Sequence, residues 1–152
     1  MSAHAAAATR RPSGPAVSPG FLLWHATLRW QRMLAAALSP LGLTHVQFVL
    51  LASALWLAEG HEQPSQRRLA EHAGTDEMMT SQVLRTLEER GLLRRERDPH
   101  DARVRVISPT ARGKRLARKA IDVVEAADAE FFEPVSRRQA LSLLGALADR
   151  PL

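Results

Sequence analysis

The chain has 152 residues, of which 45% are hydrophobic, and this size suits one globular domain with an apolar core. It contains no cysteine, which excludes disulfide bonds, thiolate metal ligands and a cysteine redox sensor. The net charge of +5 is concentrated in residues 90–119, which hold eleven Arg and Lys against three acids, and this basic centre predicts contact with a polyanion.

The N-terminal segment, residues 1–18, is rich in Ala, Pro and Ser and is predicted to be a disordered arm. A first helix is expected over residues 20–38, where apolar side chains follow two stripes. One stripe is expected to pack on the chain's own core and the other on a partner subunit. Polar and charged residues within this helix argue against a membrane span, and no signal peptide is evident, so we expect a cytoplasmic protein.

The second helix has the clearest start signal. Thr44 and Gln47 form a capping box, and Leu43 and Phe48 are placed to make a hydrophobic staple around it. The sequence then runs apolar as far as Gly60. So continuous an apolar run predicts a central, buried helix.

Residues 65–91 predict two short helices with a tight turn between them. Ser65 is a natural N-cap, and Gly74 supplies the left-handed turn that ends the first helix. Thr75 or Asp76 is expected to cap the second helix, which ends at Gly91. Its core positions are expected to be Thr80, Val83, Leu84 and Leu87.

Two antiparallel strands are predicted next, over residues 92–97 and 103–108, joined by a Pro- and Asp-rich loop. Thr110 is then expected to cap a long helix over residues 111–132, and a last helix follows Ser136. The predicted fold is mainly α with a small β-hairpin wing. A winged helix-turn-helix reader (41–110) is joined to a helical dimerisation region (20–38 and 111–150).

Three motifs carry a resemblance to a known family. Residues 87–93, Leu-Glu-Glu-Arg-Gly-Leu-Leu, resemble the end of the recognition helix in MarR-family transcriptional regulators. Residues 98–103, Asp-Pro-His-Asp-Ala-Arg, resemble the family's wing signature, and residues 110–113, Thr-Ala-Arg-Gly, the start of its long helix. The resemblance covers about residues 20–148. It implies a homodimer that binds a pseudo-palindromic operator in double-stranded DNA and is often released by a small ligand.

The chain departs from the family pattern at two places. Pro109 stands where the family more often has Leu, and this should shorten the second wing strand. The recognition helix begins Asp76-Glu77-Met78-Met79, where the family usually offers small hydroxyl residues.

The helix with core positions 80, 83, 84 and 87 presents an opposite face, here called the reading face, made of Met78, Ser81, Gln82 and Arg85. Gln82 and Arg85 are suited to bidentate bonds with adenine and guanine, and the Met78 methyl is suited to thymine C5. Two alternatives stay open: Met78 could fill a packing gap, and Arg85 could pair with Glu88 or Glu89.

Other contacts with DNA are expected from the flanking elements. Ser65 and Gln66, at the positive end of their helix, are placed for phosphate oxygens. Arg103, at the wing tip, would enter the minor groove, with Asp101 orienting its guanidinium. Arg105 lies on the same basic strand and is included among the DNA contacts.

A small apolar or aromatic effector could bind between the first and second helices, with His25 as its polar anchor; ordinary core packing is the alternative. The predicted lining is Trp24, His25, Leu28, Phe48, Leu51 and Leu55. The six histidines share no metal-ligand spacing, and neither a phosphate loop nor a nucleophile motif is present. We therefore expect no catalysis, no metal and no cofactor.

The favoured reading is a sequence-specific DNA-binding regulator, a homodimeric repressor released from its operator by a small apolar or aromatic ligand. The alternative is a ligand-blind winged-helix protein that serves as a DNA-binding or architectural factor. A third class, a winged-helix module that binds protein, predicts no salt-dependent affinity for DNA.

Overall fold

The computed structural model describes residues 18–149, so most of the predicted arm lies outside the described residues. Ser18, which the prediction counted with the arm, instead caps the first helix by accepting a hydrogen bond from the Phe21 N–H at 3.4 Å. The elements are α1 (Pro19–Leu38), η2 (Ser39–Leu41), α2 (His45–Glu59), α3 (Gln66–Ala73), α4 (Glu77–Glu89), β1 (Leu93–Arg97), β2 (Arg105–Pro109), α5 (Ala111–Phe132) and α6 (Arg137–Leu147). The predicted fold class is confirmed.

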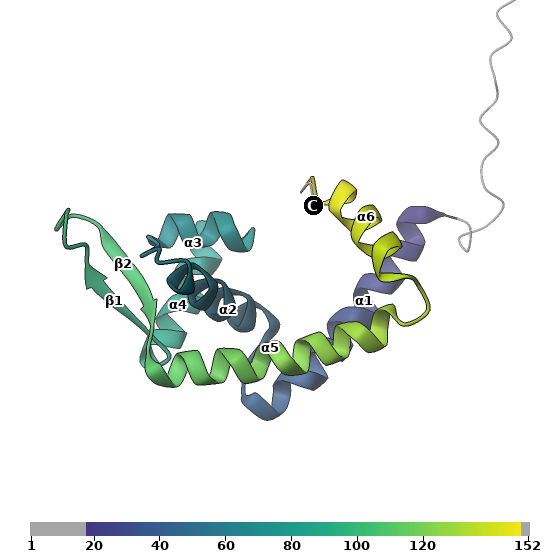
Figure 1. Cartoon of the computed structure of the whole chain (residues 1–152), viewed down its shortest axis with the longest axis horizontal. Coiled ribbons are helices and arrows are strands. Elements are labelled where there is room, and N and C mark those ends of the chain that lie inside the picture. The colour runs from purple at the N-terminus through teal and green to yellow at the C-terminus, as the bar shows by residue number, and fades with distance from the viewer. Residues whose placement is uncertain (1–17, 150–152) are drawn as a thin grey trace, which may run out of the picture.

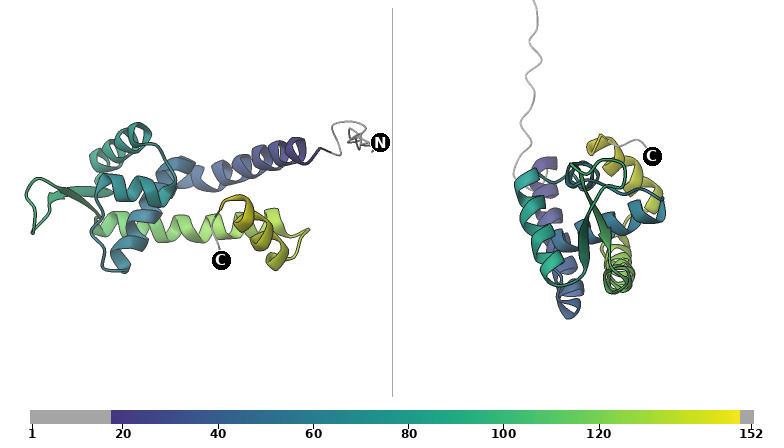
Figure 2. Two further views of the ribbon diagram at one scale, coloured as in Figure 1. Left: turned by 90° about the horizontal axis from the view of Figure 1, so that it is seen from above. Right: turned by 90° about the vertical axis from the view of Figure 1, so that its left-hand side faces the viewer.

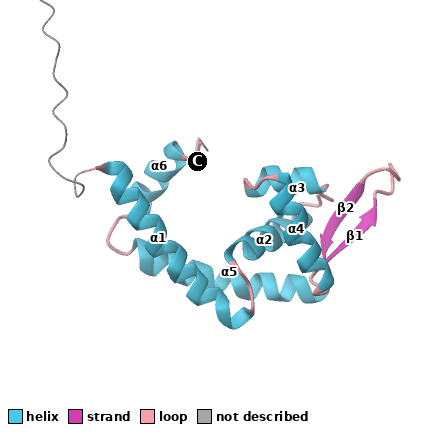
Figure 3. Cartoon of the chain, turned by 180° about the vertical axis from the view of Figure 1, so that it is seen from behind, coloured by secondary structure: helices cyan, strands magenta, loops and turns pink. Residues whose placement is uncertain are grey.

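The molecule is extended along α5 (Figures 1 and 3). At one end, α2, α3 and α4 form a compact group from which the β1–β2 hairpin projects, and at the other end the chain turns back into α6. The view from above shows that the hairpin projects beyond the helices and that α1 runs beside α5, away from α3 and α4 (Figure 2). One helix therefore connects the hairpin to the C-terminal region.

The core surrounds α2, as its apolar sequence predicts. Helices α1, α3, α4 and α5 and both strands place apolar side chains in this core, whereas α6 places none there. The buried residues include Leu34, Leu38, Leu50, Leu51, Ala54, Leu55, Leu57, Leu69, Leu84, Leu87, Leu92, Leu93, Ile107, Ala117 and Ala120.

The start of α2 has the predicted capping box. The Thr44 N–H donates to Gln47 Oε1 at 3.1 Å, and the Gln47 N–H donates to Thr44 Oγ1 at 3.3 Å. The same Gln47 oxygen accepts a hydrogen bond from Arg90 Nη1 at 3.2 Å. Gln47 therefore joins the beginning of α2 to the end of α4.

A polar and aromatic cluster lies where α1, α2 and α5 meet. Trp30 Nε1 donates to Asp128 Oδ1 at 2.7 Å, and the His45 ring packs edge-on against the Trp30 ring, with their centroids 5.1 Å apart. Burial lowers the pKa of His45, while the nearby Asp128 carboxylate acts in the opposite direction. The cluster fixes α5 to α1 near the C-terminal part of α5.

The hairpin differs from its prediction at Pro109. Strand β2 begins at Arg105 rather than at residue 103 and runs through Pro109, which lies opposite Leu93. The predicted shortening was therefore wrong. The Ile107 N–H donates to the Pro64 carbonyl at 2.8 Å, away from β1. Pro109 lies two residues after Ile107 and its backbone faces the same side, so its missing N–H removes no hydrogen bond to β1.

The start of α5 lies close to the segment between α4 and β1. Thr110 Oγ1 donates to the Gly91 carbonyl at 2.8 Å and caps α5 by accepting the Gly113 N–H at 3.0 Å. A Cβ atom at Gly113 would lie 1.9 Å from the Leu92 carbonyl oxygen. Only glycine allows this approach of helix to backbone.

Among residues 18–149, no single helix is long and apolar enough to cross a membrane. The consecutive segments 19–41 and 45–59 reach such a length and composition only when taken together, across a bend of 72°.

Candidate nucleic-acid interface

Helix α4 separates a buried side from an exposed one. Thr80 is fully buried, and its hydroxyl donates to the Asp76 carbonyl at 2.7 Å, while Leu84 and Leu87 join the core. Asp76 supplies the N-cap, since its carboxylate accepts the Met79 N–H at 2.8 Å. These positions match the predicted core side of the helix, and Val83 is partly buried against it.

The reading face lies on the opposite side. Gln82 and Arg85 are exposed, Ser81 is half-buried, and Met78 is 74% exposed. Met78 therefore does not fill a packing gap. Glu88, one alternative partner for Arg85, lies 3.3 Å from Arg95 as an ion pair. Within residues 18–149, Arg85 makes no ion pair, so its guanidinium is available to another molecule.

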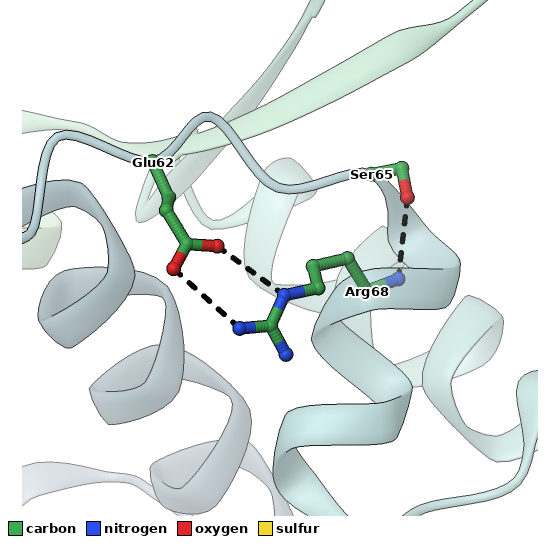
Figure 4. Close-up of polar contacts among 3 residues, drawn as sticks. All are labelled: Glu62, Ser65 and Arg68. Carbon is green, nitrogen blue, oxygen red and sulfur yellow. Dashed lines mark hydrogen bonds and ion pairs between the residues drawn. The ribbon is translucent and has the colours of Figure 1, made fainter.

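The N-terminus of α3 is stabilised by side chains of the helix and of the segment before it (Figure 4). Ser65 Oγ accepts the Arg68 N–H at 3.2 Å, and the Arg68 guanidinium donates to both Glu62 oxygens, at 3.2 and 3.5 Å. The Ser65 hydroxyl keeps its own hydrogen to donate to a phosphate. Gln66 is half-buried at the first position of the helix.

Two aspartates organise the wing tip. Asp98 Oδ1 accepts the N–H groups of His100 and Asp101, at 2.6 and 3.1 Å. Asp101 Oδ1 accepts the backbone N–H of Arg103 at 3.0 Å. The prediction that Asp101 orients the Arg103 guanidinium was therefore wrong: the carboxylate holds the backbone, because an aspartate reaches an N–H two residues on more readily than a long side chain.

Several wing cations have no acidic partner within residues 18–149. Arg94 pairs with Glu96 at 3.1 Å, but in the part of the chain that the structure describes neither Arg97, Arg103 nor Arg105 has an acidic partner. Arg97 and Arg105 also lie opposite each other in the strand register. Like charges in this position repel, and a polyanion would relieve the repulsion.

Arg97 was not among the predicted contacts. The strand ranges predicted from the sequence carried no register, and the observed register places Arg97 opposite Arg105. The basic composition of the strand was visible in the sequence, but the pairing depends on a longer tip loop, in which the Val104 N–H donates to the Asp101 carbonyl at 3.0 Å.

The structure does not bring the six residues of the predicted ligand pocket together. They are Trp24, His25, Leu28, Phe48, Leu51 and Leu55. Trp24 is 61% exposed on the first turns of α1, whereas Leu51 and Leu55 are buried in the core. A groove of about 780 Å³ lies instead between α5 and α6, and none of the six lines it.

No group of three or more His, Asp or Glu side chains within residues 18–149 is placed to hold a metal ion.

A helix-turn-helix followed by a hairpin with a cationic tip defines a winged helix-turn-helix DNA-binding protein. The model of the MarR family matches residues 43–104. The HTH-type transcriptional regulator YdcH of Bacillus subtilis is 42% identical over 127 residues, covering 84% of this chain and 86% of the relative. The chain belongs to the MarR family, and it is a DNA-binding transcriptional regulator.

Two further relatives are informative. CouR of Rhodococcus jostii, solved with p-coumaroyl-CoA, is 30% identical with a TM-score of 0.80, covering 93% of this chain and 99% of that one. CouR has also been solved on a 23-mer DNA duplex, with 27% identity, a TM-score of 0.74 and coverages of 88% and 92%. An HTH-type transcriptional repressor of Mycobacterium tuberculosis is 37% identical over 120 residues, covering 79% of this chain and 84% of the relative.

Proposed function

We propose that this regulator is a homodimeric repressor that binds a pseudo-palindromic operator and is released from it by a small aromatic ligand. The observation that carries the proposal is the unneutralised Arg97–Arg105 pair on the wing, next to a recognition helix whose polar side chains are exposed. A protein surface that holds repelling cations beside free hydrogen-bonding groups suits a nucleic-acid duplex.

The proposed roles of the DNA-contacting residues follow from the exposure and charge of their side chains. The reading face of α4 would lie in the major groove, where Gln82 and Arg85 contact base edges. Ser65 and Gln66 would contact phosphates, and the wing arginines the minor groove. The structure of CouR on a DNA duplex supports double-stranded DNA as the partner, since that chain shares the fold.

The proposed dimer rests on uncovered apolar surface. Helix α6 has no buried residue, although Leu141, Leu143, Leu144 and Leu147 lie on it. An isolated helix of eleven residues is marginally stable in water, so a partner surface is needed to hold it. The first turns of α1 expose a second apolar set, Phe21, Leu22, Leu23 and Trp24. We therefore assign residues 20–38 and 111–150 to dimerisation and residues 41–110 to the reader.

We expect the paired substitution Leu143→Glu with Leu147→Glu to convert the dimer into a monomer, because both side chains are about two-thirds exposed on one face of α6. Sedimentation at micromolar concentration measures the change. Ser142→Glu, on the same exposed helix, is the control and should leave a dimer. A stable, folded monomer of the unaltered chain would contradict the proposal.

The ligand class is proposed from the relatives. CouR has been solved with p-coumaroyl-CoA, and a MarR-family protein of M. tuberculosis with salicylic acid, at 32% identity, a TM-score of 0.62 and coverages of 87% and 95%. Both ligands carry an aromatic ring. We expect phenolic acids or their thioesters to quench tryptophan fluorescence and to lower operator affinity. If no compound of such a panel changes either signal, the ligand-blind alternative is favoured.

Arg103→Ala should weaken binding to all DNA sequences alike, because a wing-tip cation contributes mainly through charge. Each dimer loses two cationic contacts, so the slope of log K against log salt should shrink by about two units. Arg118→Ala is the matched control, since Arg118 is already paired with Glu59 at 2.9 Å. An unchanged slope in Arg103→Ala would place the wing away from DNA.

The whole proposal is tested by selecting duplexes from a randomised pool with the purified protein. An inverted repeat with half-sites about one helical turn apart is the expected product. If no duplex is enriched, the proposed pseudo-palindromic operator is contradicted.

A further inference from the structure

The recognition helix carries two adjacent, solvent-exposed thioethers. Met78 is 74% exposed and Met79 is 43% exposed, whereas Met33, in α1, is half-buried. Leaving a long apolar side chain in water forgoes the free energy that its burial would supply. Core packing therefore does not explain Met78.

The two thioethers face different directions. Met78 lies one turn before Gln82, so the two side chains share the reading face. Met79 lies about 100° further round the helix axis, on the face that contains Thr86. Only the first of the two thioethers is therefore placed among the base-reading side chains.

We propose that Met78 is an oxidation site through which peroxides weaken operator binding. The inference rests on the proposed function, because it requires the reading face of α4 to contact bases. The chain has no cysteine, so its sulfur chemistry resides entirely in methionine.

The reaction is a two-electron oxygen transfer. The Met78 sulfur attacks one oxygen of hydrogen peroxide, and a sulfur–oxygen bond forms as the oxygen–oxygen bond breaks. A proton moves to the departing hydroxide, which leaves as water, so the sulfur is oxidised to the sulfoxide and the peroxide is reduced. Exposure to solvent is the condition that this attack requires, and Met78 meets it best among the described methionines.

Oxidation changes what the side chain presents to DNA. The thioether is apolar and suits a thymine methyl group, whereas the sulfoxide carries a polar oxygen that only accepts hydrogen bonds. In the major groove this oxygen would meet the O4 and N7 acceptors of the bases. The result resembles one mismatched base in each half-site, so affinity should fall about tenfold or more.

The experiment compares wild type, Met78→Leu, Met79→Leu and Met33→Leu. Each protein is first used untreated to measure Kd on a duplex selected from a randomised pool by the untreated wild type. Each is then treated with hydrogen peroxide, and peptide mass spectrometry locates the added oxygen. The readout is the ratio of Kd after and before treatment of the same protein, so any effect of leucine on the affinity itself cancels.

The wild type should lose affinity as the Met78 peptide gains one oxygen, and methionine sulfoxide reductases should restore it. Met78→Leu should keep its own untreated Kd after oxidation, while Met79→Leu and Met33→Leu should respond like the wild type. An unchanged Kd on wild-type protein oxidised at Met78, or an equal loss in Met78→Leu, would overturn the inference. Failure of the untreated wild type to select any duplex would instead refute the proposed function, and the inference with it.

Discussion

Gly113→Ala is expected to destabilise the protein by about 3 kcal/mol, at the upper end of the cost of overpacking. The added Cβ would lie 1.9 Å from the Leu92 carbonyl oxygen and 2.9 Å from its carbonyl carbon. These are backbone atoms, which no rotamer change can move aside. Either α5 must separate from the segment that follows α4, or the Thr110 cap must break. Thermal unfolding followed by circular dichroism measures the loss.

Gly20→Ala is the control for this substitution. Gly20 also lies in a helix, but a Cβ there would have no neighbour within 4 Å. The change should therefore be neutral or slightly stabilising, since alanine favours helices more than glycine does. If both variants melt at the wild-type temperature, the close approach at Gly113 is not a feature of the protein in solution.

Arg85→Ala is expected to cost roughly 1–3 kcal/mol per half-site on the selected operator and much less on random DNA. The reason is that the exposed Arg85 guanidinium has no acidic partner among the described residues, so it is available for a bidentate contact with guanine. Fluorescence anisotropy on matched specific and random duplexes measures both affinities. Asp101→Ala, by contrast, should weaken both alike, because it loosens the Arg103 backbone.

An equal loss on specific and random DNA in Arg85→Ala would show that the recognition helix has been misplaced. The face of α4 that contains Met79 and Thr86, with Arg90 just beyond the helix, would then have to read the bases. Arg90 is a poor candidate on structural grounds, because its guanidinium already donates to Gln47.

The helices could be predicted closely because their signals are local. Ser65, Asp76 and Thr110 each accept an N–H three residues further along the chain. Such a contact depends only on the spacing of residues within one turn. The buried side of α4 could likewise be predicted, since the helical period alone determines which positions share a face.

What could not be predicted depends on neighbours distant in the sequence. Strand β2 can run through Pro109 because this side of the strand faces Pro64, to which Ile107 donates, and not β1. The strand propensities of single residues carry no information about such a partner. The placement of Trp24 could not be predicted for a similar reason. Trp24 and Leu51 are both apolar, but only the C-terminal part of α1 packs in the core, so Trp24 is exposed while Leu51 is buried. The contact between Asp101 and its backbone partner was missed because opposite charges suggested an ion pair instead.

The bond between Trp30 and Asp128 joins α5 to α1 near the end of α5 that lies away from the wing. From Asp128 to Ala111 the helix is about 26 Å long, because each residue adds about 1.5 Å. A rotation of α5 by about 10° about the Trp30–Asp128 contact would move its N-terminal end, at the base of the wing, by about 4–5 Å. Successive base pairs are only about 3.4 Å apart, so this movement would shift the base of the wing relative to the DNA by more than one base pair. A molecule bound beside the Trp30–Asp128 contact would need to displace the neighbouring side chains by only a fraction of that distance.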